Sequence, residues 1–272
     1  MSSGGGRGGH RRPSGWTGGD FLGGDQVEGH HAVGELLRAG RRRALRVWAS
    51  SAQAERGPVA ELVALAGRRG VPVALKAPEA LASAAQTAAP QGVVAWAEPV
   101  RSADLDLLVA AETGHPPFLV CLDGVTDPGN FGSVLRTALC AGVDGVVVGR
   151  HRSALLTPAA VKAAAGAVEH LPVAAVPGVP AALARLSSAG IWCVGLDAGA
   201  SADICSTPVL GDAVALVMGA EGRGLSPLAA RRCDTLVRIP QSGLLGSLNV
   251  AAAAAVACFE VARRRYGAES RA

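Results

Sequence analysis

Short apolar runs alternate with segments of helical spacing along most of the chain. From residue 118 onward, such runs predict six buried strands, at 118–122, 146–148, 173–176, 191–196, 213–218 and 235–239. Helical patterns lie between and after them, at 130–141, from 157, at 180–187, from 226 and at 247–266. Apolar strands that alternate with helices are typical of a parallel sheet covered on both faces. We therefore expect an α/β domain with a parallel sheet over residues 117–267.

A smaller α/β unit is predicted upstream, over residues 23–100. Its strands are expected at 44–49, 71–75 and 93–96, and its helices at 32–40, from 58 and at 78–86. Residues 101–116 begin polar and end in glycine and proline, which predicts a linker. Residues 1–22 are rich in glycine and arginine without an apolar period, so we expect a disordered basic tail. Such a tail either contacts phosphate weakly or is only solvated.

Composition supports a globular protein with one or two domains. Of the 272 residues, 49% are hydrophobic and 18% are charged, which is enough for a sizeable core. The net charge is +4, with 24 arginines and two lysines. No secretory segment and no apolar run of the ~20 residues needed to span a membrane is present, so we expect a cytoplasmic location. The six cysteines are scattered without a C-x-x-C pair, which favours buried thiols over a metal site.

Polar and glycine-rich clusters follow three of the predicted strands, at 123–136, 219–224 and 243–249. Ligands of parallel sheets bind beyond the carboxyl ends of the strands, so these clusters predict a pocket walled largely by backbone. The glycines at 219, 222 and 224 read G-x-x-G-x-G, not the G-x-G-x-x-G of a dinucleotide fingerprint. A Walker loop is also absent. Spacing alone therefore indicates only a nucleotide-like ligand.

At these clusters the chain closely resembles the SpoU (TrmH) family of knotted RNA methyltransferases. The resemblance rests on three motifs in order: Asn130-x-Gly132-x-x-x-Arg136, Met218-Gly219-x-Glu221-x-x-Gly224 and Ile239-Pro240-x-x-Gly243-x-x-x-Ser247-Leu248-Asn249-Val250. Upstream, two segments are similar to the RNA-binding module of the bacterial 23S rRNA guanosine 2′-O-methyltransferases: Gly29-x-His31-Ala32-Val33 and Gln91-Gly92-Val93. The resemblance covers residues 26–266.

The resemblance implies S-adenosylmethionine as methyl donor and a ribose 2′-hydroxyl of structured RNA as acceptor. A guanosine of 23S rRNA is the favoured substrate, and tRNA guanosine or a resistance methylation of rRNA remains open. It also implies a homodimer, a trefoil knot in the C-terminal domain and an L30e-like fold for the smaller RNA-binding unit. The sequence departs from the family at Gln241, where methionine is usual, and at Ala251, where serine is common. Both departures bear on substrate choice more than on the reaction.

Carried over residue by residue, the resemblance implies an adenosyl pocket and a catalytic group. The pocket would be lined by Gly219, Ile239 and Leu248. The catalytic group would comprise Arg136, Asn130, Glu221, Ser247 and Asn249. Family accounts propose the arginine as base, but a guanidinium resists deprotonation. We interpret Arg136 as a ligand of the adjacent phosphate that stabilises charge on the ribose oxygen.

Two interpretations of the sequence other than an RNA methyltransferase are weighed against it. A non-catalytic RNA-binding or ribosome-assembly protein could retain the pocket, although the intact catalytic group argues against it. A nicotinamide-dependent oxidoreductase is disfavoured by the order and position of the glycines.

Overall fold

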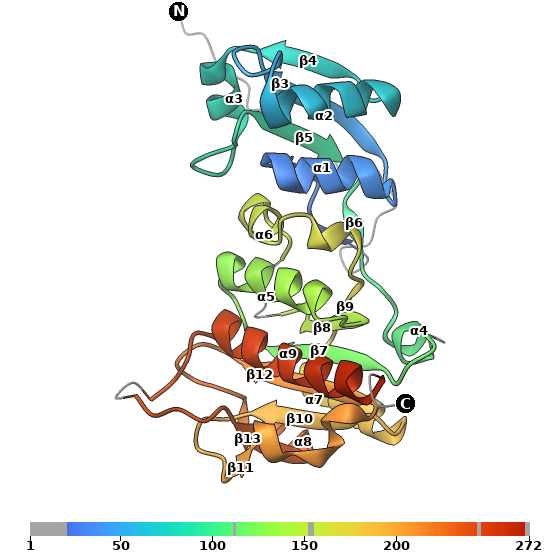
Figure 1. Ribbon diagram of the computed structural model, residues 1–272, viewed down its shortest axis with the longest axis vertical. Coiled ribbons are helices and arrows are strands. Elements are labelled where there is room, and N and C mark those ends of the chain that lie inside the picture. The colour runs from blue at the N-terminus through green and yellow to red at the C-terminus, as the bar shows by residue number, and fades with distance from the viewer. Residues whose placement is uncertain (1–20, 111–112, 152–154, 244–245, 270–272) are drawn as a thin grey trace, which may run out of the picture.

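The structure is a computed structural model that describes residues 21–110, 113–151, 155–243 and 246–269. Residues 1–20, which make up nearly all of the expected basic tail, lie outside the described residues. Two sheets stand one above the other along the long axis of the molecule, with helices between them (Figure 1). The smaller sheet belongs to the N-terminal part of the chain and the larger one to the C-terminal part.

The smaller sheet has four strands in the order β2-β5-β3-β4. They are β2 (Gln26–Glu28), β3 (Ala44–Ser50), β4 (Val73–Lys76) and β5 (Val93–Ala97). The associated helices are α1 (His30–Ala39), α2 (Gly57–Arg68) and α3 (Pro78–Ala84). Gly40 ends α1 in the left-handed region, at φ 59°, as its position after the helical pattern predicts.

The larger sheet has seven strands in the order β11-β13-β10-β12-β7-β8-β9, all parallel. They are β7 (Phe118–Asp123), β8 (Gly145–Gly149), β9 (Val173–Val176), β10 (Trp192–Leu196), β11 (Ala202–Asp203), β12 (Val214–Gly219) and β13 (Thr235–Arg238). This confirms the parallel α/β sheet. Because β12 lies between β10 and β7, the carboxyl ends of these strands meet at one edge.

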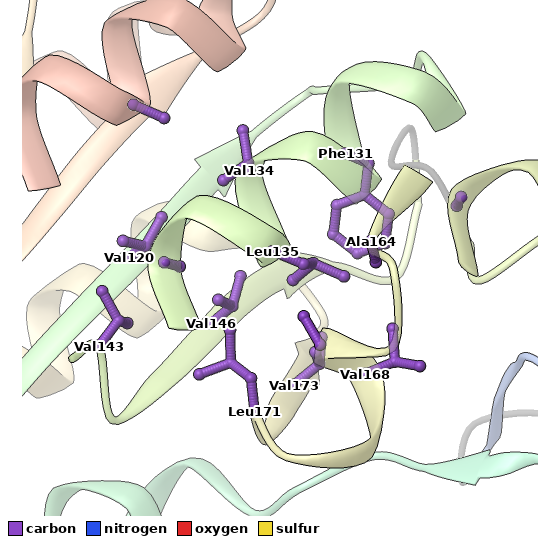
Figure 2. Packing of buried hydrophobic residues seen from close by; sticks show 14 of the residues in the cluster. Val120, Phe131, Val134, Leu135, Val143, Val146, Ala164, Val168, Leu171 and Val173 are labelled. Carbon is purple, nitrogen blue, oxygen red and sulfur yellow. The ribbon is translucent and has the colours of Figure 1, made fainter. Parts of the chain in front are cut away.

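Helices bury both faces of this sheet, which explains its continuous apolar runs. In β7, Phe118 and Val120 belong to one core cluster, and Leu119 and Cys121 belong to a second cluster on the opposite face. The first face is covered by α5 (Pro128–Cys140) and α9 (Val250–Glu269), and α6 (Pro158–Ala163) packs on α5 and reaches β2 of the smaller sheet. The second is covered by α4 (Leu105–Val109), α7 (Val179–Ser188) and α8 (Pro227–Arg232). Figure 2 shows the α5 side chains that pack into the first cluster.

Several short elements were not predicted from the sequence, among them the strands β2 and β11. The short helix α4 lies within the segment expected as a linker, and Leu105 and Leu108 are buried against the sheet. Strand β1 (Phe21–Gly23) pairs with β6 (Val100–Arg101) in an antiparallel ribbon. These elements are two to five residues long, too short to show a period in the sequence.

A buried ion pair joins the two parts of the chain. Arg42, which follows α1, donates from Nη2 to Glu169 Oε1 at 2.6 Å and from Nε to Oε2 at 2.9 Å. Its Nη1 donates to the carbonyls of Gly24 and Glu98, both at 2.6 Å. The side chains of Arg42 and Glu169 are only 9% and 1% exposed. The part of the chain that carries the smaller sheet is therefore held to the larger domain by this buried, hydrogen-bonded ion pair.

Candidate functional site

The loop after β12 folds back on itself, and its glycines make that fold possible. Ala220 and Gly224 exchange backbone hydrogen bonds, at 3.0 Å and 2.8 Å. A Cβ on Gly219 would lie 2.0 Å from the carbonyl carbon of Gly224, so only glycine fits there. Gly222 and Gly224 have φ of 77° and 64°, in the left-handed region that favours glycine. The absent Cβ at 219 thus serves closure of the loop as well as access to its backbone.

A second loop leads from β13 to the start of α9. Its last residue, Asn249, accepts a hydrogen bond at Oδ1 from the backbone N–H of Ala251 at 2.8 Å. This bond satisfies one of the free N–H groups at the start of α9 and fixes the direction of the Asn249 side chain.

A cavity of about 460 Å³ lies between these two loops. Its walls come from the carboxyl ends of β10, β12 and β13 and from the start of α9. The apolar lining comprises Leu196, Met218, Leu225, Val237, Ile239, Leu248, Val250 and Ala253. The volume falls within the range of about 300–1,000 Å³ typical of small-molecule pockets. Gly219, Ile239 and Leu248 all line it, as do Glu221 and Ser247.

Three side chains from three distant segments meet in one hydrogen-bonded cluster. Asn130 donates from Nδ2 to Glu221 Oε2 at 3.0 Å. Asn249 donates from Nδ2 to Asn130 Oδ1 at 3.0 Å and approaches Glu221 Oε1 at 3.4 Å. We call these residues the Asn130–Glu221–Asn249 cluster. Because Glu221 also lines the cavity, the cluster adjoins it, and each amide is held with a defined orientation.

The helix after β7 begins before residue 130, where the helical pattern predicts its start, so Asn130 is not its cap. Helix α5 begins at Pro128, and the cap is Asp127, whose Oδ1 accepts from the Asn130 backbone N–H at 2.7 Å. Proline at the first helical position fits this start because its missing N–H has no partner to lose. With the capping done by Asp127, the Asn130 amide is free to reach Glu221.

Arg136 lies outside this cluster. It is exposed on α5 and does not line the cavity, and its side chain makes no hydrogen bond or ion pair with any residue that the structure describes. Six residues on an ideal helix turn the side chain by about 120° from Asn130 and move it about 9 Å along the axis. The buried face of α5 carries Phe131, Val134 and Leu135 (Figure 2). The guanidinium is therefore left available to a ligand.

Two acidic residues at strand ends complete the site, and the sequence did not single them out. Asp197 follows β10, lines the cavity, and accepts at Oδ1 from Gly199 N at 2.7 Å. Asp123 ends β7 and accepts at Oδ2 from Ser226 N at 2.8 Å, which ties β7 to the start of α8. Their positions in the sequence could have indicated them, because each carboxylate comes at or directly after the end of an apolar run, where ligands of parallel sheets bind.

Two kinds of feature are missing from the described ranges. There, no group of three or more His, Cys, Asp or Glu residues is placed to hold a metal ion. Over the same ranges, no helix has the length and apolar character needed to cross a membrane.

Comparison with known proteins matches both parts of the chain. Residues 117–259 match the SpoU rRNA Methylase family, and residues 26–103 match the family model described as RNA 2′-O ribose methyltransferase substrate binding. The 23S rRNA (guanosine-2′-O-)-methyltransferase RlmB of Pseudomonas syringae is 40% identical over 245 residues, 89% of this chain and 96% of that protein. A putative TrmH family tRNA/rRNA methyltransferase of Bacillus subtilis, YacO, is 36% identical over 244 residues, 89% of this chain and 96% of the relative.

Solved structures agree with these relatives. The SpoU methyltransferase AviRb from Streptomyces viridochromogenes, in complex with the cofactor AdoMet, superposes with a TM-score of 0.74 at 26% identity over 91% of both chains. The family match spans more than half of the sequence, and the curated relatives are aligned almost end to end. The chain therefore belongs to the SpoU rRNA methylase family.

Proposed function

We propose that this protein transfers a methyl group from S-adenosylmethionine to the ribose 2′-hydroxyl of a guanosine in 23S rRNA. The observation that carries the proposal is the cavity joined through Glu221 to the Asn130–Glu221–Asn249 cluster. The relatives support the assignment, because RlmB proteins at about 40% identity are named for this reaction and AviRb was solved with AdoMet.

The lining of the cavity fits S-adenosylmethionine. Ile239 and Leu248 offer apolar surface for a flat adenine ring, and Leu248 is 39% exposed. The folded 219–224 loop presents backbone groups without side chains in the way. Asp197 and Glu221 place two carboxylates at the cavity against the single guanidinium of Arg223, so the lining carries a net negative charge suited to a cationic ligand.

The mechanism that we propose is mainly one of alignment. The sulfonium methyl supplied by S-adenosylmethionine is already electrophilic, so the chain must orient the acceptor and allow the 2′-hydroxyl to lose one proton. Holding the two reactants in line can contribute up to roughly 7–11 kcal/mol. In this account, Ser247 and Asn249 hold the loop against the reacting groups. Asn130 and Glu221 keep the acceptor side of the site ordered through their hydrogen bond.

Arg136 then has the role of a phosphate ligand. Its guanidinium is exposed and has no partner among the described residues, and it lies on the same helix as Asn130. Bidentate binding of the phosphate next to the target ribose would bring the 2′-oxygen toward the cluster and stabilise charge on it. The proton would pass to phosphate or water, because a guanidinium is a poor base.

We also propose the roles of the two domains, the homodimer and the trefoil knot that the family resemblance implies. Residues 23–100 would dock structured RNA as an L30e-like unit, joined through residues 101–116 to a methyltransferase domain over 117–267 that is threaded as a trefoil knot. A homodimer is supported by α9, whose exposed side carries Val256 and Phe259, 43% and 50% exposed. A substrate in the ribosome would place the protein in the cytoplasm.

Mapping 2′-O-methyl groups in cells with and without the gene tests this function. We expect one guanosine of 23S rRNA to lose its methyl group when the gene is deleted. Loss of a tRNA methyl group instead would favour the tRNA alternative, which the tRNA/rRNA description of the B. subtilis relative keeps open.

Calorimetry distinguishes the methyltransferase from an RNA-binding protein and from an oxidoreductase. A chain that fails to bind S-adenosylmethionine would be an RNA-binding or assembly protein, and binding of NAD would indicate an oxidoreductase.

A further inference from the structure

One face of the four-stranded sheet carries two of the four tryptophans of the chain together with two cations. Along β3, Val47 and Ala49 are fully buried, whereas Arg46 and Trp48 alternate with them on the opposite face and are only partly buried. Trp96 of β5 pairs directly with Arg46 across the sheet. Lys76, the last residue of β4, pairs with Ser50 on this face. We call Arg46, Trp48, Lys76 and Trp96 the tryptophan platform.

The four side chains of the platform are stacked on one another. The Trp48 and Trp96 rings meet edge to face, with centroids 5.1 Å apart and an interplanar angle of 68°. The Arg46 guanidinium lies 4.4 Å from the Trp96 centroid and 5.9 Å from that of Trp48. Lys76 Nζ lies 4.8 Å from the Trp48 centroid. These distances are within the reach of cation–π attraction, so the cations hold the rings in fixed positions.

Within the part of the chain that the structure describes, no carboxylate forms an ion pair with the platform, neither at Arg46 nor at Lys76. Arg46 Nε is buried there without a hydrogen-bond partner, so ring stacking rather than polar bonding holds this side chain. Glu28 of β2 shares the face but is fully buried, and it accepts hydrogen bonds from Gln26 and Thr87. The platform therefore keeps two positive charges beside two partly exposed aromatic rings.

We propose that the tryptophan platform stacks an unpaired base of the RNA substrate while Arg46 and Lys76 contact the flanking phosphates. Aromatic rings interleaved with cations match single-stranded RNA, whose bases present free π-faces next to a charged backbone. A paired helix hides those faces, so the platform would select a loop or bulge near the methylated nucleotide. This inference rests on the proposed function and adds to it the part of the RNA that the smaller sheet recognises.

Tryptophan fluorescence tests the contact directly. In the full chain carrying Trp16→Phe and Trp192→Phe, all emission comes from Trp48 and Trp96. Titration with an RNA hairpin that has an unpaired loop should quench this emission, because a stacked base lies against the ring. A fully paired duplex of equal length and charge should bind more weakly and leave the emission unchanged.

Affinity measurements on single variants supply the second arm. Trp48→Leu and Trp96→Leu should each weaken binding of the hairpin by about 5- to 150-fold, the range seen for loss of one base–aromatic stack. Arg46→Gln and Lys76→Gln should each reduce the slope of log affinity against log salt by about 0.7. The matched control is Trp192→Leu, a tryptophan of β10 that is 44% exposed and stacks with no cation among the residues that the structure describes. Its affinity for the hairpin should stay unchanged.

The outcomes distinguish a failure of the proposed base stacking from a failure of the proposed methyltransferase function. Unaltered affinity for S-adenosylmethionine shows that a variant is folded. If the hairpin binds without quenching, and Trp48→Leu and Trp96→Leu match Trp192→Leu, the platform is structural and the inference is overturned while the methyltransferase stands. If the unsubstituted chain binds neither RNA nor S-adenosylmethionine, both fail.

Discussion

Asn130 and Glu221, which lie 91 positions apart in the sequence, are joined by a hydrogen bond of 3.0 Å between Nδ2 and Oε2. Asn130 comes from the first turn of α5 and Glu221 from the closed loop after β12. Asn249 completes the arrangement by donating to Asn130 Oδ1 at 3.0 Å. The two bonds therefore link all three polar clusters that follow the strands, and Glu221 places them at the border of the cavity.

Replacing Asn130 with alanine should separate catalysis from cofactor binding. The variant removes the donor that orients Glu221 but no atom that lines the cavity. We expect kcat to fall on the order of 10²-fold, the effect of small misplacements at a reacting centre, and the affinity for S-adenosylmethionine to change little. Methyl-transfer kinetics and calorimetry measure the two. Cys140→Ala, an exposed change on the same helix, is the control. Equal kcat in the two variants would remove Asn130 from the catalytic group.

Gly219→Ala should abolish binding of S-adenosylmethionine. The new Cβ would lie 2.0 Å from the carbonyl carbon and 2.2 Å from the following amide nitrogen of the Gly224–Leu225 peptide, so the 219–224 loop must open. Calorimetry reads the loss. Gly67→Ala, in α2, places the same methyl group in open space and should stabilise the protein by about 0.5–1 kcal/mol. An undiminished affinity in Gly219→Ala would show that the closed loop is not part of the cofactor site.

Arg42→Ala should lower the free energy of unfolding by about 3–5 kcal/mol, because it leaves the Glu169 carboxylate buried without a partner. Chemical denaturation followed by circular dichroism measures the change. The control is Arg38→Ala, which breaks the Arg38–Glu35 pair, whose side chains are 57% and 32% exposed. That variant should change stability by no more than about 1 kcal/mol. Similar effects in both variants would mean that the Arg42–Glu169 pair does not join the two parts of the chain.

Thiol reactivity should divide the cysteines into two groups. Burial raises the pKa of Cys193, Cys233 and Cys258 to about 12, and that of Cys121 well above its usual value of 9. Only Cys140 and Cys205 are exposed. A thiolate-selective reagent at pH 8 should therefore label two thiols in the native protein and six after denaturation. Fast labelling of four or more native thiols would contradict the buried assignment.

The same shifts predict a decline of stability at alkaline pH. The folded protein keeps these thiols protonated, whereas the unfolded chain releases their protons above about pH 9. The unfolded state then binds fewer protons than the folded state, so the free energy of unfolding falls as the pH rises from 9 toward 12. Replacing Cys258 with alanine should make this fall shallower. An identical slope in that variant would show that the thiol does not contribute.

Most strands of the larger sheet, and the position of its cavity at their carboxyl ends, could be predicted because they follow local rules. Ile239 and Leu248 were expected in the cavity lining only through the family resemblance. An apolar run that ends in a glycine loop marks a strand and its ligand-binding end, as at Gly219. The cap of α5 could not be chosen from the sequence, because Asp127 and Asn130 are both good capping residues. Only the fold shows that Asp127 is the cap and that the Asn130 side chain contacts Glu221 instead. The Arg42–Glu169 pair and the tryptophan platform depend on contacts between distant segments, which no local pattern encodes.

In the proposed function, S-adenosylmethionine bound in the cavity between the two glycine loops transfers its methyl group to a ribose oxygen of 23S rRNA. The most direct test is to incubate the purified protein with S-adenosylmethionine labelled in its methyl group and 23S rRNA that lacks this modification, and then to digest the RNA to nucleosides. We predict label in 2′-O-methylguanosine, at a single site, and its loss in the Gly219→Ala variant. Label on a base, or no label in an unsubstituted protein that binds both ligands, would contradict the account.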